Sequence, residues 1–281
     1  MNNFLALPRG FVGASPRRRR LRLLRRVSLL AFALCGIKVV VHSLHLEIWS
    51  LNGLFASEVA SVVFLVSFLL SGVLTDYKES EKIPGAISTA LETLSLEIQG
   101  IPAYNPKASI DGSLRSVFDL GWSMRDWILE KVSSTDVYAS HRRTHAKVVD
   151  AATFLSSSTL QGRLMGEMST LLLLTNRIRV IRQTSFVPLV YWMADLAAFL
   201  LCTGLVLART PALMESLFFL FVLVFLLIFL LRVISDIDNP FSWNDRNSAE
   251  QIDLSVLDET LNRLEAALPT APARGDQVSM L

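Results

Sequence analysis

The sequence has few of the residues and motifs on which enzyme and metal chemistry depends. Its only two cysteines, Cys35 and Cys202, lie in apolar stretches, so neither a disulfide framework nor a thiolate metal site is supported. No Gly-x-Ser-x-Gly elbow, phosphate-binding loop or dinucleotide-binding motif occurs. We therefore expect a protein that is not an enzyme and has no cofactor, with an intramembrane enzyme as the alternative.

Acidic residues are missing from the beginning of the chain, where the first carboxylate is that of Glu47. Seven arginines occupy residues 17–26, although the whole chain carries a formal net charge of only +2. Such a basic arm attracts anionic lipid headgroups, which explains it better than nucleic-acid binding does. A cleavable signal is one alternative, although Leu34 is too large for the position before a lipidated Cys35. An organellar transit peptide over residues 1–26 is another.

Long apolar runs are what the sequence has in abundance. Apolar residues make up 52% of the chain, and its mean hydropathy is +0.45. These residues concentrate in four blocks, at 27–44, 54–75, 186–208 and 212–234. Each block is close to the ~20 residues that a helix needs to cross a bilayer, and residues 217–231 contain no polar side chain at all. The sequence predicts a multi-pass integral membrane protein.

The arginines before the first block predict a cytoplasmic N-terminus, because Lys and Arg beside membrane helices are retained on that side. Four crossings then place both termini in the cytoplasm. The plasma (inner) membrane is the expected location, with an organellar membrane as the alternative. The predicted parts are a basic arm (1–26), a transmembrane hairpin (27–75) and a helical cytosolic domain (76–185). A second transmembrane hairpin (186–234), a cytosolic C-terminal segment (235–267) and a disordered tail (268–281) follow.

The region between the two hairpins has helical periodicity, and the expected fold class is all-α. Pro84 should end or kink the extension of the second membrane helix. Helices are predicted over residues 86–99, 113–132 and 137–184, the last with a break near residues 156–158. A turn-rich loop should follow residue 99, and residues 133–136 offer N-cap residues for the helix predicted from residue 137.

Ionisable residues inside the apolar blocks cost free energy in a bilayer, so each is a functional hypothesis. We single out four: Lys38, Glu58, Asp195 and Glu215. Counted from the starts of their blocks at ~1.5 Å per residue, Lys38 and Asp195 reach comparable depth, which predicts an interhelical ion pair; a proton relay is the alternative. Glu58 and Glu215 lie near the outer ends of their blocks, where either could snorkel to the interface. If the second helix lines a pore, Glu58 would instead form an acidic ring at the pore mouth and influence selectivity.

The sequence His141-Arg-Arg-Thr-His145 places two imidazoles at positions i and i+4, a spacing that can hold a metal ion on one helix face. No third ligand lies nearby in the sequence, and Arg142 and Arg143 would repel a cation. The segment therefore predicts a solvated basic face, and no metal site is expected.

Two segments carry motifs typical of one family of membrane proteins. In the first, Phe64 and Phe68 are followed by Thr75 and by an acidic-x-x-Pro ending at Glu81 and Pro84, and the run is similar to the bestrophin pore helix. The second follows the fourth block and resembles the family's acidic-Asn/Asp-Pro-Phe motif; its residues are Asp236, Asp238, Asn239, Pro240 and Phe241. Residues 253–258 follow it as in prokaryotic members. The chain thus resembles the bestrophin channels and bestrophin-like membrane proteins, and order and spacing agree across about residues 25–265.

The resemblance implies a homopentamer in which five copies of the second helix surround an axial pore. Its hydrophobic neck would consist of Ala60, Phe64 and Phe68, and chloride or other small anions would pass through it. The partners implied are membrane lipids, small inorganic ions and further copies of the chain, with no nucleic acid. Without the resemblance, Phe64 and Phe68 would be interpreted as packing or lipid-facing residues.

The sequence departs from the family pattern at several positions. Ala60 replaces the bulky residue usual at the first neck position, and Asp76-Tyr77-Lys78 stands where the family tends to carry arginine and tryptophan. Residues 242–248 supply one carboxylate, Asp245, too few for a strong calcium site. Asp236 and Asp238 are instead expected to cap or brace the junction after the fourth helix.

Two functions from different classes follow. The first is an oligomeric ion channel, whose ion sign is open because the resemblance implies anions whereas Glu58 favours cations. The second is a non-conducting membrane scaffold or sensor whose cytosolic helices bind a partner. A monomer or dimer would contradict the channel.

Overall fold

The computed structural model describes residues 16–50, 52–183, 188–210, 212–238, 240–241 and 252–268. Apart from turns and loops, this part of the chain is helical except for a pair of two-residue strands. The predicted all-α class is confirmed. The first fifteen residues of the basic arm and nearly all of the predicted tail lie outside the described residues, as do Asn239 and Asp245.

The chain divides into two compact units. The first, here called the membrane unit, contains α1 (Pro16–Ser43), α2 (Gly53–Glu81) as far as Tyr77, α7 (Pro188–Leu207) and α8 (Leu213–Ile237). The second, here called the helical unit, begins at Lys78. It contains α3 (Ile83–Tyr104), α4 (Asp111–Ile128), α5 (Ser134–Ala152), α6 (Ser158–Gln183) and α9 (Ser255–Ala267).

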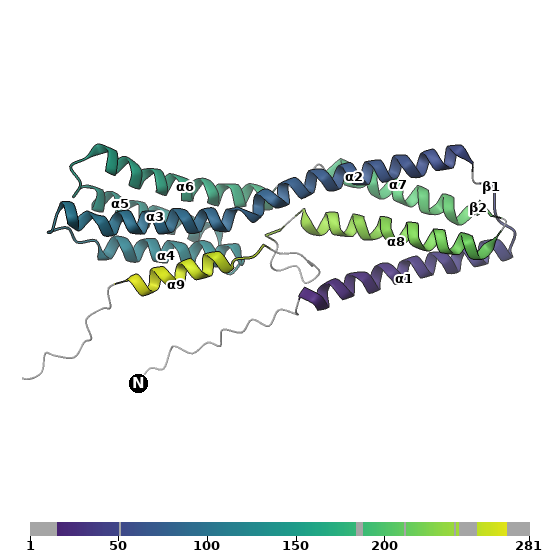
Figure 1. Ribbon diagram of the computed structural model, residues 1–281, viewed down its shortest axis with the longest axis horizontal. Helices are drawn as coiled ribbons and strands as arrows, with labels where there is room; N and C mark the ends of the chain where they lie inside the picture. The colour runs from purple at the N-terminus through teal and green to yellow at the C-terminus, as the bar shows by residue number, and fades with distance from the viewer. Residues whose placement is uncertain are drawn as a thin grey trace, which may run out of the picture. The chain divides into compact units, whose positions relative to one another are not determined.

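In the membrane unit, α1, α7 and α8 pack against one another, as Figure 1 shows. Their contacts are apolar, and α2 joins the same core through side chains that recur on one face: Val62, Val66, Leu69 and Val73. Near the start of α2, Phe55 lies over Gly204 of α7. A Cβ at Gly204 would stand 3.1 Å from the Phe55 ring, so the absence of a side chain there permits this close approach.

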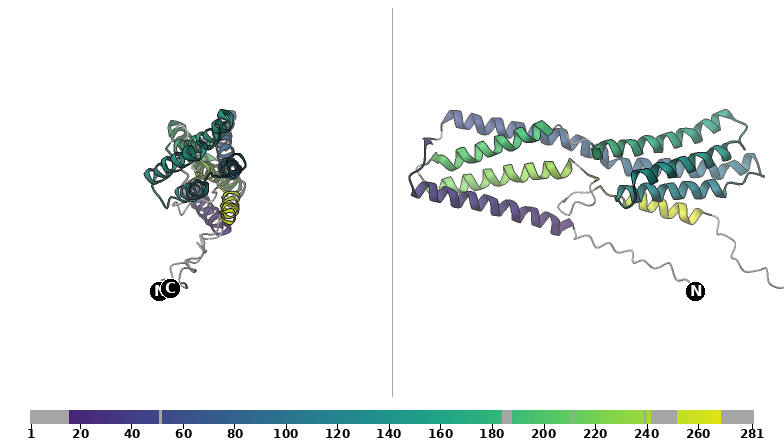
Figure 2. Two further views of the ribbon diagram at one scale, coloured as in Figure 1. Left: turned by 90° about the vertical axis from the view of Figure 1, so that its left-hand side faces the viewer. Right: turned by 180° about the vertical axis from the view of Figure 1, so that it is seen from behind.

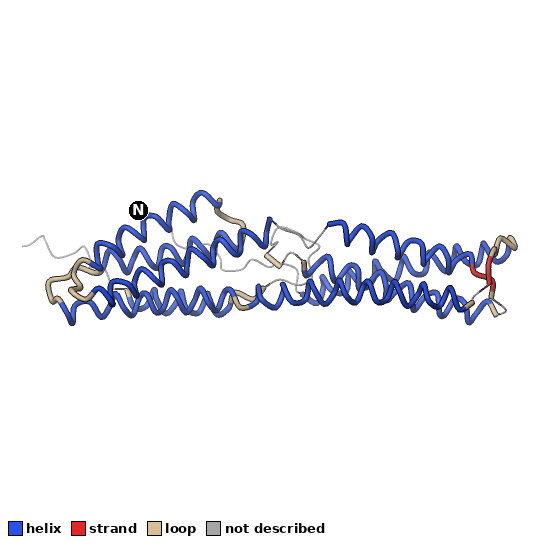
Figure 3. Tube along the Cα trace, turned by 90° about the horizontal axis from the view of Figure 1, so that it is seen from above, coloured by secondary structure: helices blue, strands red, loops and turns tan. Residues whose placement is uncertain are grey.

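The two short strands join segments that follow α1 and α7. Strand β1 (Trp49–Ser50) pairs in parallel with β2 (Ala208–Arg209), with Trp49 opposite Ala208; the pair is red in Figure 3. The backbone N–H of Ile48 also donates to the carbonyl of Leu207 at 3.0 Å. The ends of α1 and α7 are therefore held at the same level.

Three stretches of helix among the described residues are long and apolar enough to cross a membrane: Gly53–Tyr104, Leu189–Leu207 and Leu213–Ile237. They correspond to the second, third and fourth predicted blocks. The first block lies within α1, which begins at Pro16 rather than Val27 and is not one of the three. The count of four crossings remains a prediction.

The helical unit is a bundle in which α3 packs on α6 and α4 packs on α5, and these helices run alongside one another in Figure 2. Its core is a single cluster of buried hydrophobic residues, most of them aliphatic. Of the N-cap candidates at residues 133–136, Ser133 forms the cap: its hydroxyl accepts from the N–H of Asp136 at 3.2 Å, while the Asp136 carboxylate accepts from the N–H of Ser133. This reciprocal arrangement satisfies two donors that the first helical turn would leave unpaired.

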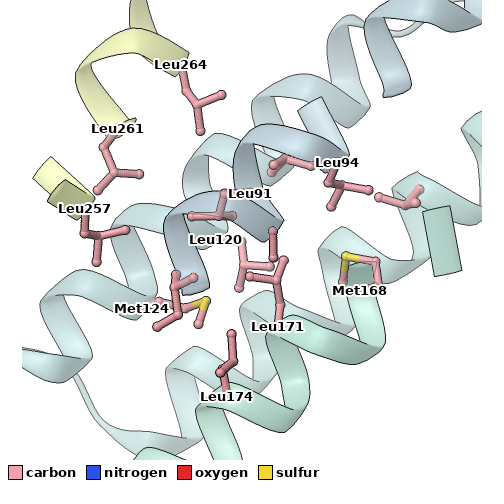
Figure 4. Packing of buried hydrophobic residues seen from close by; sticks show 14 of the residues in the cluster. Leu91, Leu94, Leu120, Met124, Met168, Leu171, Leu174, Leu257, Leu261 and Leu264 are labelled. Atoms are coloured by element: carbon pink, nitrogen blue, oxygen red, sulfur yellow. The ribbon is translucent and has the colours of Figure 1, made fainter. Parts of the chain in front are cut away.

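Helix α9 lies on α3 and α4 through Leu257, Leu261 and Leu264 (Figure 4). Gly121 of α4 makes room for it, because a Cβ at that position would stand 2.5 Å from a methyl group of Leu261. Ion pairs flank this contact: Arg125 with Asp258, and Arg263 with Glu92 at 3.0 Å.

The predicted break before Pro84 is confirmed, while several helix boundaries differ from prediction: α3 begins at Ile83 rather than residue 86, α4 ends at Ile128 rather than residue 132, and α5 begins at Ser134 rather than residue 137. Helix α2 ends at Glu81 and α3 begins at Ile83, so Pro84 lies in the first turn of α3, where its missing N–H costs no helical hydrogen bond. Helix α3 then continues to Tyr104 with Pro102 inside it, so the loop predicted after residue 99 is wrong for its first residues. Burial of Ile101 in the core favours the extra turn.

Candidate functional site

Helix α2 presents Ala60, Phe64 and Phe68 on one exposed face. The two phenyl rings are 73% and 62% exposed, and Ala60 is exposed as well. The spacing of four residues aligns the three along the helix, on the side away from Val62, Val66 and the rest of the apolar core. Within one chain, therefore, most of the surface of the two phenyl rings implied as neck residues is uncovered.

The same exposed side of α2 carries five hydroxyl groups: Ser57, Ser61, Ser67, Ser71 and Thr75. Four of them donate to the backbone carbonyl four residues earlier, at 3.0 Å for Ser57, 2.8 Å for Ser61, 2.7 Å for Ser67 and 2.9 Å for Thr75. Each of these oxygens keeps acceptor capacity that can meet water. The outward surface of α2 therefore alternates hydroxyls with phenyl rings.

Helices α7 and α8 differ from α2 in this respect. Their exposed side chains are mainly large and apolar, including Leu189, Trp192 and Phe199 of α7 and Phe218, Phe219 and Leu226 of α8. Such surfaces suit hydrocarbon, whereas a column of hydroxyls does not.

Glu58 is exposed near the start of α2. It precedes Phe64 by six residues, so at 3.6 residues per turn it lies roughly 120° around the helix from that ring. It precedes the buried Val62 by four residues, so its direction is closer to that of the core-facing side than to the face formed by Ala60, Phe64 and Phe68. Glu215 lies in the first turn of α8, also exposed.

Lys38 is completely buried, and its acidic partner differs from the predicted one. Its ammonium donates to Glu47 at 2.7 Å and to the carbonyl of Ala208. The Nδ1 atom of His42 lies 3.1 Å from the same Glu47 carboxylate. The structure thus pairs Lys38 with the loop after α1 rather than with Asp195.

The reason is the register of α1 and α7. The strand pair holds the ends of both helices at one level, and Lys38 lies five residues before Ser43 whereas Asp195 lies twelve before Leu207. At 1.5 Å per residue, Asp195 is about 10 Å farther from those ends. The prediction counted depth from the start of the apolar block, but α1 begins eleven residues before that block.

The Lys38 hydrogen bond also lowers the pKa of the Glu47 carboxyl, with a smaller contribution in the same direction from His42; burial opposes both. Glu47 is therefore ionised at neutral pH. Its ion pair with Lys38 holds the segment between α1 and α2 against the end of α1. Sequence reasoning noted Glu47 as the first acidic residue but did not pair it with the nearest buried lysine.

Asp195 instead lies in the wall of a groove of about 750 Å³ between α1 and α7, with α8 as its floor. Arg232 of α8 lines the same groove. Sequence reasoning missed this arginine, although it is the only basic residue within the apolar block 212–234.

The motif after α8 is partly described. Asp238 is the C-cap residue of α8 and lies close enough to Tyr191 of α7 for their side chains to interact. Pro240 is buried, and Phe241 is completely buried in the core of the helical unit. Phe241 therefore anchors the chain where it enters that unit. Asp236 is half-buried at the end of α8.

The His141 and His145 pair does not form a metal site. His141 is buried, its Nε2 atom lies 2.9 Å from the Thr175 hydroxyl, and burial lowers its pKa to about 4. His145, Arg142 and Arg143 are exposed, so the predicted basic face is present but excludes His141. Within the described residues no group of three potential metal-ligating side chains occurs.

These features define an integral membrane protein with an all-α fold. Most of its helical unit is formed by the segment between the apolar helices α2 and α7. Solved structures with this fold include bestrophin homologues. A bestrophin homologue from Klebsiella pneumoniae, a single-substitution variant, matches at a TM-score of 0.68 with 14% identity, over 86% of this chain and 98% of that one. A second single-substitution variant of the same protein matches at a TM-score of 0.68 with 14% identity, over 88% of this chain and 96% of that one. A variant of a protein described as a membrane protein matches at a TM-score of 0.69 with 13% identity, over 88% of this chain and 99% of that one.

No protein-family model matches the sequence, and a search of curated proteins found no match. The likeness is therefore one of fold, and it extends over most of the chain. It confirms the bestrophin-like architecture that the two short motifs implied.

Proposed function

We propose that this protein is a bestrophin-like oligomeric ion channel in which copies of α2 surround an axial pore. The observation that carries the proposal is the exposed face of α2, where hydroxyls alternate with Phe64 and Phe68. Serine hydroxyls that face lipid would form no hydrogen bonds with their surroundings, whereas in a pore they would form hydrogen bonds with water. A ring of α2 helices places this face inside and leaves the apolar faces of α7 and α8 outside.

In this arrangement Ala60, Phe64 and Phe68 form a hydrophobic neck. Phenyl rings that narrow a pore can gate it by dewetting, and their positive edges can interact with passing anions. We propose chloride and other small anions as the permeating ions and five as the number of copies. Both termini and the helical unit would be cytoplasmic, with α1 as a fourth crossing.

The test is recording from the full-length protein in planar bilayers with asymmetric salt. Replacing both rings (Phe64→Ala and Phe68→Ala) should give a leaky conductance several times that of the wild type, since a wider and less apolar neck stays wet. The matched control is Phe218→Ala with Phe219→Ala on the exposed face of α8, which should leave the current unchanged.

An unaltered current in the folded double variant of α2 would remove these residues from the pore. A monomeric or dimeric protein in mild detergent would reject the channel itself. It would favour the scaffold or sensor, for which the exposed Leu96 and Leu173 of the helical unit offer apolar partner contacts.

A further inference from the structure

The groove between α1 and α7 is amphipathic along its length. Most of its wall is aliphatic or aromatic, including Leu34, Ile37 and Val41 of α1 and Phe199 of α7. Apart from Cys202 and Thr203, its polar side chains gather at the end where α7 begins and α8 ends. They are Tyr191, Asp195, Arg232 and Ser235. Its volume of about 750 Å³ lies within the range of small-molecule sites, roughly 300–1,000 Å³.

Asp195 and Arg232 face this groove at nearly the same level. Helices α7 and α8 are antiparallel neighbours, and Tyr191 lies beside Asp238. Asp195 is four residues farther along α7, and Arg232 is six residues back along α8. At 1.5 Å per residue, their levels differ by about 3 Å.

Neither charge has a partner among the described residues, since no ion pair or hydrogen bond joins Asp195 or Arg232 to another of them, and both side chains are exposed. Opposite charges beside hydrocarbon require solvation by protein, water or a ligand. A ligand that carries one negative and one positive group would satisfy both.

The length of the apolar part identifies the rest of the ligand. From Asp195 to Leu207 the groove follows α7 for twelve residues, or about 18 Å. One leaflet of the hydrocarbon core is about 15 Å thick, half of the ~30 Å of a bilayer. The apolar part therefore accommodates one extended acyl chain.

We propose that this groove binds a phospholipid with a zwitterionic, primary-amine headgroup, such as phosphatidylethanolamine. The Arg232 guanidinium donates to the phosphate, and the Asp195 carboxylate accepts from the ammonium group. An acyl chain lies along Ile37, Val41 and Phe199. This proposal requires that the protein lies in a membrane, and it does not depend on ion conduction.

The test is native mass spectrometry of the full-length protein, released from nanodiscs that contain phosphatidylethanolamine, phosphatidylcholine or phosphatidylglycerol. The wild type should retain phosphatidylethanolamine about tenfold more than either competitor, because only that headgroup offers both a phosphate and N–H donors. Retention independent of headgroup would overturn the proposal.

Two variants separate the roles of the charges. Asp195→Asn should abolish the preference for phosphatidylethanolamine over phosphatidylcholine, while Arg232→Gln should weaken retention of all three lipids about tenfold. The matched control is Arg179→Gln, an exposed arginine of α6 outside the groove, which should retain lipid as the wild type does. Equal retention by Arg232→Gln and the control would contradict the site.

A third variant tests the apolar part without altering charge. Thr203 is exposed in the groove wall, and Thr203→Trp should displace the acyl chain and remove retention. It decides the question if a charge variant does not fold. If a second copy of the chain fills the groove, the wild-type oligomer will hold no lipid and Thr203→Cys will cross-link between copies; that result would overturn the proposal.

Discussion

The membrane unit and the helical unit bury a basic side chain in opposite ways. In the membrane unit, Lys38 is completely buried and bonded to Glu47 and to the Ala208 carbonyl. In the helical unit, His141 is buried beside the Thr175 hydroxyl, and no counter-charge contacts it among the described residues. A lysine cannot shed its proton cheaply and so requires a carboxylate, whereas a histidine becomes neutral when burial lowers its pKa.

The comparison also shows what each unit exposes. Large apolar side chains such as Phe32, Phe199 and Phe219 cover the membrane unit, while charged residues such as Arg142 and Arg143 are exposed on α5 of the helical unit. An apolar exterior with a buried ion pair suits a bilayer, and a charged exterior with a neutral buried histidine suits water.

Breaking the lysine pair should have the largest effect on stability. Glu47→Gln leaves the Lys38 ammonium buried without a counter-charge, and we expect a loss of about 3 kcal/mol. Thermal unfolding of the detergent-solubilised protein measures it. The double variant Lys38→Met with Glu47→Gln removes both charges and should recover most of the loss. If Glu47→Gln alone is as stable as the wild type, the ion pair does not hold this segment.

Titrating His141 should have the next largest effect. Its folded pKa of about 4 lies below its ordinary value of 6.5, so the unfolded chain binds the proton more tightly. Stability is then complete above pH 6.5 and falls as the pH is lowered toward 4, by up to about 3 kcal/mol. Chemical denaturation across this range gives the slope.

The control for this titration is His141→Gln, which cannot bind a proton in this range but can still hydrogen-bond to Thr175. Its stability should change less between pH 6.5 and 4 than that of the wild type. An identical pH dependence in both proteins would mean that other groups cause the acid sensitivity.

The smallest effect is expected at Glu58, because its carboxylate is exposed near the start of α2 but lies roughly 120° around the helix from Phe64. Glu58→Lys should shift the reversal potential toward greater anion selectivity by a modest amount, because the charge acts on ions entering the mouth rather than in the neck. Glu215→Lys, on the exposed first turn of α8, is the matched control. Equal reversal potentials in all three proteins would remove Glu58 from the ion pathway.

Periodicity and apolar runs predicted most of the helices. The three apolar blocks after the first and the cap at Ser133 correspond to structure, because local patterns of burial and capping specify where helices form. The continuation of α3 through Pro102 was missed, since the burial of Ile101 that favours it is a tertiary contact. The start of α1 was missed because arginines precede its apolar block.

The amino-acid sequence by itself determined the class of protein, the positions of the apolar helices and the alignment of Ala60, Phe64 and Phe68, because spacing along a helix decides which residues share a face. Only the tertiary structure decided which charges meet. The strand pair aligns α1 with α7, so that Lys38 forms an ion pair with Glu47, while Asp195 lies with Arg232 in the wall of the groove. Such pairings depend on the relative register of helices far apart in the chain, which no local pattern encodes.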